Sequence, residues 1–419
     1  MTLDPVHVDG IARLAGRVSG GVDERDQQDL AETVWAEFLD PLVRDGDVVL
    51  EPLGRQRRRK ADVEAVALQD PPFPSTHGLD SGTINPTTFK NGLVMDVSQA
   101  AMAAVPSDLE LHRARTIVMT VHTNDDTFTV AHDDWTASDE GFVRERVLHA
   151  PRVDRYEQNV VHALALYLAE SNHALTQADV VDDLLILDGP IYPTGLLKWV
   201  ERDTELADLL EAGQEPADIV RNYVALIERF VERDVPLLGF VKNSTSKAIT
   251  HAIRRNDAAP NAPWNDDAAF FTRVLARHDD GDRLTDALTF TDWFVSRVGT
   301  DGVLARDASV VEFDPALPRT DYEVTFFVVY DPRDDLLYRV EAPYAFTKDE
   351  QLREALTRQV LSEVAAERGP PLAVAKADEL ARIDRDGKEQ LRREIERTFE
   401  SDRHRRYDDK RWGMSFEEL

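Results

Sequence analysis

An uninterrupted apolar run at residues 184–187 (LLIL), closed by Asp188-Gly189-Pro190, most constrains what this chain can fold into. A continuous apolar run of this length that ends in a turn is typical of a central strand buried on both faces. A second run of the same kind spans residues 235–241 (VPLLGFV). Two such strands need helices on both sides of a sheet, so the sequence predicts an α/β fold.

The order of the predicted elements narrows the fold class further. Three strand-like segments precede the first buried run, and their close spacing favours antiparallel pairing. A long helix follows them, and helical segments then alternate with the two buried strands. This order, of three antiparallel strands, helix, strand, helix, strand, helix, is that of a ribonuclease H-like mixed sheet flanked by helices. The predicted bounds are strands at 77–82, 92–97 and 115–122, a helix at 155–172, helical segments at 195–234 and a helix from residue 246.

At 419 residues the chain exceeds the usual size of one domain, so the sequence predicts three regions. Residues 1–74 are predicted to be a helical N-terminal extension that ends in a proline-punctuated linker. Residues 75–345 are predicted to form the ribonuclease H-like core, with a helical insertion and a late hairpin. Residues 346–419, which are helical in pattern and strongly charged, are predicted to complete the core.

Composition limits the chemistry that this chain can perform. Because the chain has no cysteine, disulfides, zinc-thiolate sites and thiol nucleophiles are excluded, which leaves carboxylates and eleven histidines as possible metal ligands. No apolar stretch approaches the roughly 18 residues of a membrane span, and the first ten residues lack a signal-peptide pattern. The sequence therefore predicts a cytoplasmic protein without a membrane partner.

The charge balance is strongly acidic, with 79 acidic and 49 basic residues and a formal net charge of −30. The charge is dispersed along the chain, which favours adaptation to high salt, as in halophilic proteins, because molar salt screens the repulsion. A hydrophobic content of 42% argues against disorder. The densest basic run, residues 55–60 (RQRRRK), is compatible with a solvated turn or with a phosphate-contacting patch. The acidic balance does not exclude a nucleic-acid substrate.

Two aspartates lie where a sheet could gather metal ligands. Asp188 ends the most apolar strand of the chain, and open sheets bind ligands at the carboxyl ends of their strands. Asp80, in the segment GLDSGT, lies within the first predicted strand of the core. Converging carboxylates are the oxygen ligands that Mg²⁺ or Mn²⁺ needs for phosphodiester hydrolysis. Each residue also has a structural interpretation, as an Asx-turn cap at Asp188 and as an Asp-Ser-Gly turn at Asp80.

A third acid is expected on the helix between the third and fourth strands. Glu157 begins this helix and lies on the same stripe as apolar residues at three- and four-residue spacing, which predicts that it faces the sheet. Favourable interaction of its charge with the helix dipole is the structural alternative. Glu170 lies on a largely different face and precedes the polar residues 171–173, where the helix is predicted to end in solvent. Glu157 is therefore the expected middle ligand, and Glu170 is not.

Five segments, in this order and at these distances, resemble the motifs of the NurA family of archaeal and bacterial DNA repair nucleases: GLDSGT, RYEQNVVHALA, LLILDGPIYP, LLGFVKNSTSK and PLAVAKADELARI. The resemblance covers roughly residues 75–395. It implies a ribonuclease H-like fold, a toroidal homodimer, and Mn²⁺-dependent single-strand endonuclease and 5′ to 3′ exonuclease activity on DNA in double-strand break repair. It also implies a hexameric HerA-type helicase as partner. Asp80, Glu157 and Asp188 would then be the metal ligands, with Mn²⁺ or Mg²⁺ bound.

Two further residues complete the expected catalytic set. Lys242 ends the second buried strand, where an ammonium could neutralise charge on the scissile phosphate. Asp378 lies where a ribonuclease H-like site would draw its last acid from a C-terminal helix. The family often has histidine where Lys376 stands, so this segment departs from its pattern. Asp292, in FTDWF, is a lesser candidate whose expected role is a helix N-cap.

Three functional hypotheses remain open at this level. The first is a metal-dependent DNA nuclease that acts in end resection with the helicase. The second is a DNA-clamping or helicase-stimulating adaptor without catalysis, a hypothesis suggested by Lys376 at a position where the family often has histidine. The third is another ribonuclease H-like enzyme, such as a junction resolvase or an RNA-guided nuclease.

Overall fold

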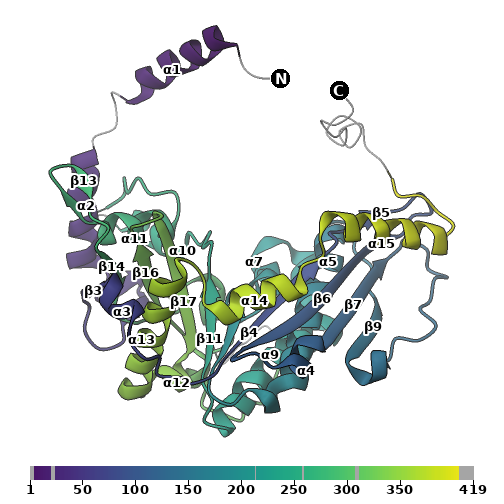
Figure 1. The fold of residues 1–419 in the computed structure, drawn as a ribbon. Coiled ribbons are helices and arrows are strands. Elements are labelled where there is room, and N and C mark those ends of the chain that lie inside the picture. Colours follow the sequence, from purple (N-terminus) through teal and green to yellow (C-terminus); the bar gives the residue numbers. More distant parts are fainter. Residues whose placement is uncertain (1–3, 20–23, 213, 257–258, 307–310, 405–419) are drawn as a thin grey trace.

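A large mixed β-sheet with helices on both faces forms the body of the protein in this computed structural model (Figure 1). The structure describes residues 4–19, 24–212, 214–256, 259–306 and 311–404. Three strands, β3 (Arg58–Asp62), β5 (Thr87–Thr88) and β14 (Ala287–Thr291), pair with the sheet off its main path. The main path runs, edge to edge, through β1 (Leu42–Arg44), β2 (Asp47–Pro52), β15 (Phe294–Ser296), β16 (Val324–Asp331), β17 (Leu336–Pro343), β11 (Leu237–Val241), β10 (Leu185–Asp188), β4 (Thr76–Thr83), β6 (Val94–Val105), β7 (Arg115–His122), β9 (Val143–His149) and β8 (Thr136–Ser138).

The centre of the sheet has the strand order β7-β6-β4-β10-β11. Strand β6 is antiparallel to both β4 and β7, as the sequence predicts for the first three strands. Strands β4, β10 and β11 are mutually parallel. Because parallel strands end at the same edge of a sheet, side chains at the ends of these three strands can meet.

Helices from distant parts of the chain cover the two faces. On one face, α5 (Glu157–Gln177) packs on β6 and β7, and α9 (Gln214–Glu232) packs on α5. Leu185 and Leu187 of β10 belong to that core, whereas Ile186 points to the other face, which α13 (Glu350–Glu367) and α14 (Leu372–Ala381) cover. Since side chains alternate along a strand, Asp188 lies on the α14 face.

The prediction of a wholly helical region before residue 75 is wrong for residues 42–62. Helices α1 (Pro5–Ser19) and α2 (Glu24–Phe38) are present, but β1, β2 and β3 follow them, and β2 and β3 pair with β15 and β14. Long-range pairing decides the structure of this segment, which has little apolar periodicity of its own. The segment also ends in the short helix α3 (Val63–Ala67).

The basic run 55–60 is partly strand β3, and its arginines pair with acids from distant segments. The ion pairs are Arg57 with Asp292 at 2.7 Å, Arg58 with Glu32 at 2.7 Å and Arg59 with Glu354 at 2.8 Å. These contacts join β3 to α2, to α13 and to the turn between β14 and β15. The run therefore differs from the solvated turn that was one of its two interpretations.

The remaining helices follow the predicted order. Helical segments fill the span between β10 and β11, and α10 follows β11 as expected. In the last region α13, α14 and α15 are helical, and residues 405–419 lie outside the described residues. In the part of the chain that the structure describes, no helix is both long and apolar enough to span a bilayer. The helices not yet given bounds in this region are α6 (Thr194–Leu197), α7 (Trp199–Arg202), α8 (Thr204–Ala212), α10 (Ala248–Arg255), α11 (Asp267–Leu275), α12 (Tyr344–Thr347) and α15 (Arg385–Thr398).

Two glycines allow α14 to lie directly against β4. A Cβ at Gly78 would stand 2.2 Å from the carbonyl oxygen of Ala373, and a Cβ at Gly82 would stand 2.1 Å from that of Ala381. Four strand residues span about 13 Å and eight helix residues span about 12 Å, so helix and strand run side by side between these two contacts. Figure 1 shows α14 in front of the sheet, next to β4. Asp80, midway between the glycines, therefore faces the middle of α14.

We expect Gly82→Ala to destabilise the protein by about 1–3 kcal/mol, because the added methyl group would collide with a backbone carbonyl that cannot rotate away. The displaced α14 should also weaken divalent-metal binding. Urea unfolding and calorimetric Mn²⁺ titration measure the two effects. Gly369→Ala is the matched control, since a Cβ there would meet its first neighbour at 3.8 Å. Equal behaviour of the two variants would show that close packing of α14 is unimportant.

Candidate metal centre

Three carboxylates from distant parts of the chain meet at the carboxyl end of β10. Asp80 of β4, Asp188 of β10 and Asp378 of α14 each offer an oxygen, and these oxygens lie within 4.8 Å of one another. The three side chains are half-buried. Three clustered carboxylate oxygens are the donor set that a hard divalent cation such as Mg²⁺ or Mn²⁺ takes, so the residues fit such an ion. No other group of this kind occurs among the described residues.

The strand geometry explains why the two strand aspartates converge. Asp188 is the last residue of β10, and Gly189, with φ of +134°, turns the chain away directly after it. Leu187 pairs with Leu79 across β10 and β4, which brings Asp188 and Asp80 to neighbouring positions of adjacent parallel strands. The side chains of both residues point to the face of the sheet that α14 covers. The predicted convergence of Asp80 and Asp188 is therefore present in the structure.

Lys242 follows β11 and lies beside these acids. Its Nζ atom is 2.6 Å from Oδ2 of Asp188. The ammonium offsets part of the charge of the carboxylate cluster and stands next to its rim, with 31% of its side chain exposed. Lys242 therefore lies beside the acids, as predicted from the sequence.

Burial and repulsion by a neighbouring carboxylate raise the pKa values of Asp80 and Asp188 and favour protons on these two groups when no cation is bound. Burial, followed by the neighbouring Asp188, raises the pKa of Asp80 to about 8, although the Ser81 amide donates to it. Burial also raises the pKa of Asp188, and the hydrogen bond from Lys242 opposes that rise. A divalent cation would supply the missing positive charge and displace the protons.

We expect divalent-metal affinity to rise between pH 6 and pH 8 and binding to release protons, because the ligands must be deprotonated. In the metal-free protein the same shift has the opposite effect on folding. The pKa of Asp80 is 3.8 when unfolded and about 8 when folded, so its contribution to stability falls as pH rises between these values. Mn²⁺ titration calorimetry in buffers of different ionisation enthalpy measures the released protons. Affinity that stays constant across this range would contradict the protonation of the cluster.

Glu170 is the acid that the sequence interpretation wrongly placed in solvent. Helix α5 continues to Gln177, and Glu170 accepts hydrogen bonds from Ser81 Oγ at 2.5 Å and from Tyr223 Oη at 3.0 Å. Burial raises the pKa of Glu170 to about 7, and Asp188 contributes to that rise. Ser81 follows Asp80 and points to the opposite face of β4, so Glu170 approaches the cluster from the α5 face of the sheet.

Glu157 does not join the acids. It is the first residue of α5, thirteen residues before Glu170, which places it about 20 Å away along the helix axis. It therefore cannot share an ion with residues near Glu170. A sequence signal for the longer helix existed, since no glycine or proline follows Asn172 before Gly189 to end the helix.

Two other candidates take structural positions. Lys376, on α14, donates to Ser107 Oγ at 3.2 Å and is directed away from the acids. Asp292 caps no helix, contrary to expectation. It lies between β14 and β15 and pairs with Arg57 and Arg59. Asp378, expected as a catalytic acid and not as a ligand, is the third member of the metal cluster, where it also pairs with Arg382 at 2.7 Å.

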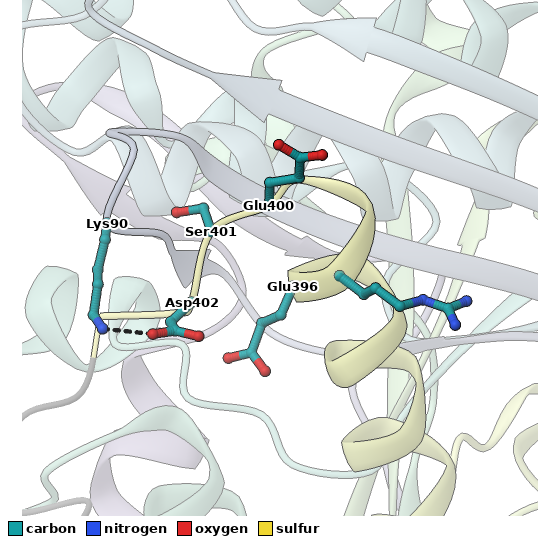
Figure 2. A pocket seen from close by; sticks show the side chains of 6 residues that line it. Lys90, Glu396, Glu400, Ser401 and Asp402 are labelled. Carbon is teal, nitrogen blue, oxygen red and sulfur yellow. Dashed lines mark hydrogen bonds and ion pairs between the residues drawn. The ribbon is translucent and has the colours of Figure 1, made fainter.

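A hollow at the end of α15 has a different character (Figure 2). It has a volume of about 390 Å³, and none of the three acids lines it. Its Lys90 is bonded to Asp402 at 2.7 Å, and Glu396 and Glu400 add negative charge. Arg397, the other cation of the hollow, pairs with Glu394, so both positive groups that line it already have acidic partners.

The fold and the carboxylate cluster define an α/β protein with a candidate divalent-metal centre at the carboxyl edge of its sheet. A profile of the NurA domain matches residues 74–383, and the chain therefore belongs to the NurA family. The fold is similar to a crystal structure of the NurA nuclease from Sulfolobus solfataricus, at 12% identity and a TM-score of 0.45 over 95% of this chain and 98% of that chain. It is also similar to a crystal structure of NurA bound to dAMP and manganese, at 10% identity and a TM-score of 0.40 over 91% and 94% of the two chains. No curated protein matches the chain.

Proposed function

We propose that this protein is a metal-dependent nuclease that hydrolyses phosphodiester bonds in DNA. The observation that carries the proposal is the meeting of Asp80, Asp188 and Asp378 beside the ammonium of Lys242. Clustered carboxylates bind the divalent cations that phosphoryl-transfer enzymes use, and an adjacent cation suits an anionic substrate. Membership of the NurA family supports the choice of substrate.

The ribonuclease H-like assignment is part of this proposal. The central order β7-β6-β4-β10-β11 supports it, with β6 antiparallel and the other core strands β4, β10 and β11 parallel. The placement of the acids also supports it: Asp80 is on the first core strand, Asp188 ends the fourth, and Asp378 is on the late helix α14. The three-region division at residues 74 and 345 is likewise a proposal, with α14 completing the site of the middle region.

Each residue has a distinct role in the proposed chemistry. Asp80, Asp188 and Asp378 would hold the cation, which when bound polarises the phosphoryl oxygen and activates water for attack. Lys242 holds Asp188 in place and presents positive charge beside the cluster, where charge builds up on the phosphate. Glu170 supports Asp80 from the other face through Ser81, so it takes the position that the sequence assigned to Glu157.

The finer features follow from the family resemblance and are proposed with it. They are single-strand endonuclease and 5′ to 3′ exonuclease activity, Mn²⁺ or Mg²⁺ as the ion, and a role in resection of double-strand break ends. A homodimer and a HerA-type hexameric helicase are the proposed partners. Adaptation to high salt and a cytoplasmic location are the proposed setting for a chain of charge −30.

Cleavage assays with the purified protein test this function. Single-stranded, double-stranded and junction DNA are incubated with Mn²⁺, with Mg²⁺ or with EDTA, at several salt concentrations. The proposal predicts cleavage of linear DNA that needs the cation. Binding without cleavage, with and without the helicase, would favour the inactive adaptor. Cleavage confined to junctions or to guide-loaded substrates would favour another ribonuclease H-like enzyme.

A further inference from the structure

A pocket of about 250 Å³ lies between the start of β7, strand β9 and the end of α5. Its walls include Arg115, Arg144 and Thr176, and apolar side chains such as Leu111 and Phe142 complete it. Two guanidinium groups line this pocket, although the protein has thirty more acidic than basic residues. The pocket shares no residue with the carboxylate cluster.

Arg115 is oriented by the backbone and not by an acid. Its Nη1 atom donates to the carbonyl oxygens of His112 and Ala114, both at 2.7 Å. No carboxylate forms an ion pair with Arg115 among the described residues. Burial lowers the pKa of Arg115, and no neighbouring acid offsets the effect. Only Nη1 is used in these contacts, so the Nε and Nη2 groups can donate hydrogen bonds to a bound ligand.

Arg144 is held in a similar way by neutral groups. Its Nη1 atom donates to Thr176 Oγ1 at 3.0 Å, and its guanidinium lies 5.0 Å from the ring centre of Trp135. The described residues supply no ion-pair partner for Arg144 either. The hydroxyl and the ring fix the direction of the side chain while leaving its other N–H groups available.

The acids at the pocket have other roles or lie in solvent. Asp108 uses Oδ1 to accept from the amides of Glu110 and Leu111 at the start of α4 (Leu109–Arg113). The Glu110 side chain is exposed. Behind the pocket, the buried hydroxyl of Thr116 shares a hydrogen bond of 3.0 Å with His173. Burial and Arg115 lower the pKa of His173 to about 3, so this imidazole adds no charge at neutral pH.

We propose that this pocket binds a phosphate group, held between the guanidinium groups of Arg115 and Arg144. A planar guanidinium donates two parallel hydrogen bonds to phosphate oxygens, and two such groups can engage one tetrahedral anion from two sides. The volume is slightly below that of pockets that enclose drug-sized ligands, which suits a phosphate and part of the molecule that carries it. The phosphate belongs either to a free monoester or to a nucleic-acid strand. The inference does not depend on catalysis at the carboxylate cluster.

The test measures binding and not cleavage, so it stays informative if the proposed nuclease activity is absent. The full chain in EDTA is titrated with inorganic phosphate, and binding is followed by calorimetry and by ³¹P line broadening. Wild type is compared with Arg144→Gln, and Arg146→Gln is the matched control. Arg146 belongs to the same strand and lies 5.9 Å from the same Trp135 ring, but it bonds to the Asp133 carbonyl and does not line the pocket.

Arg144→Gln is expected to weaken phosphate binding about tenfold, because a charge-assisted hydrogen bond is lost, whereas Arg146→Gln should change it less than about twofold. Oligonucleotides with and without a 5′-phosphate distinguish the two sources. A defect confined to inorganic phosphate and the 5′-phosphorylated strand assigns the site to a monoester, and an equal defect on both strands assigns it to an internal phosphodiester. Equal effects of the two substitutions on phosphate binding, or no binding by wild type at millimolar phosphate, would overturn the proposal.

Discussion

Asp188→Asn is expected to reduce metal-dependent DNA cleavage by at least about a thousandfold while the protein remains folded. Asp188 contributes an oxygen to the three-carboxylate cluster and forms an ion pair with Lys242. Its loss therefore removes a metal ligand and frees the Lys242 ammonium from its partner. A bound cation is worth several kcal/mol in the transition state, and about 4 kcal/mol corresponds to that factor. Steady-state cleavage of a labelled single strand and Mn²⁺ calorimetry measure the loss.

The folded state should tolerate this change, because the asparagine relieves repulsion among the clustered carboxylates. Thermal unfolding without metal should therefore show a stability equal to or above that of wild type. Asp182→Asn is the matched control, since it removes an exposed aspartate near the opposite end of β10. Wild-type cleavage and Mn²⁺ affinity in Asp188→Asn would show that the cluster is not the metal centre.

Glu170→Gln is expected to lower cleavage about 10- to 100-fold, and Glu157→Gln is expected to leave it unchanged. Glu170 accepts hydrogen bonds from Tyr223 and from Ser81, the residue that follows Asp80. Loss of a group that supports a metal ligand commonly lowers activity by this amount. Glu157 lies about 20 Å from Glu170 along α5. The pair reverses the assignment made from sequence alone.

The two glutamates belong to the same helix and receive the same substitution, so each variant controls for the other. Initial rates at saturating Mn²⁺ and Mn²⁺ affinity are compared for both. Circular dichroism and thermal unfolding check that α5 remains intact. A loss of activity in Glu157→Gln with full activity in Glu170→Gln would restore the original assignment and would require the cation to bind elsewhere.

The sequence by itself determined the central sheet and the two strand aspartates. The apolar run that becomes β10 has no stable location except between two helical layers, and Asp188 ends it where ligands bind to open sheets. The close spacing of the first three core strands likewise encoded their antiparallel pairing. These features are local, because strand periodicity and turn residues act within about ten positions.

Tertiary structure decided how the other acids reach the site, although the family resemblance had already pointed to Asp378 as a catalytic acid. Asp378 arrives because Gly78 and Gly82 let α14 lie on β4, a contact between segments about 300 residues apart that no local pattern encodes. Glu170 replaced Glu157 because α5 continues through a polar segment that becomes buried on packing. The strands of residues 42–62 likewise depend on edges provided by β14 and β15. For residues 42–62, pairing with a distant partner outweighed the weak local preference of the segment.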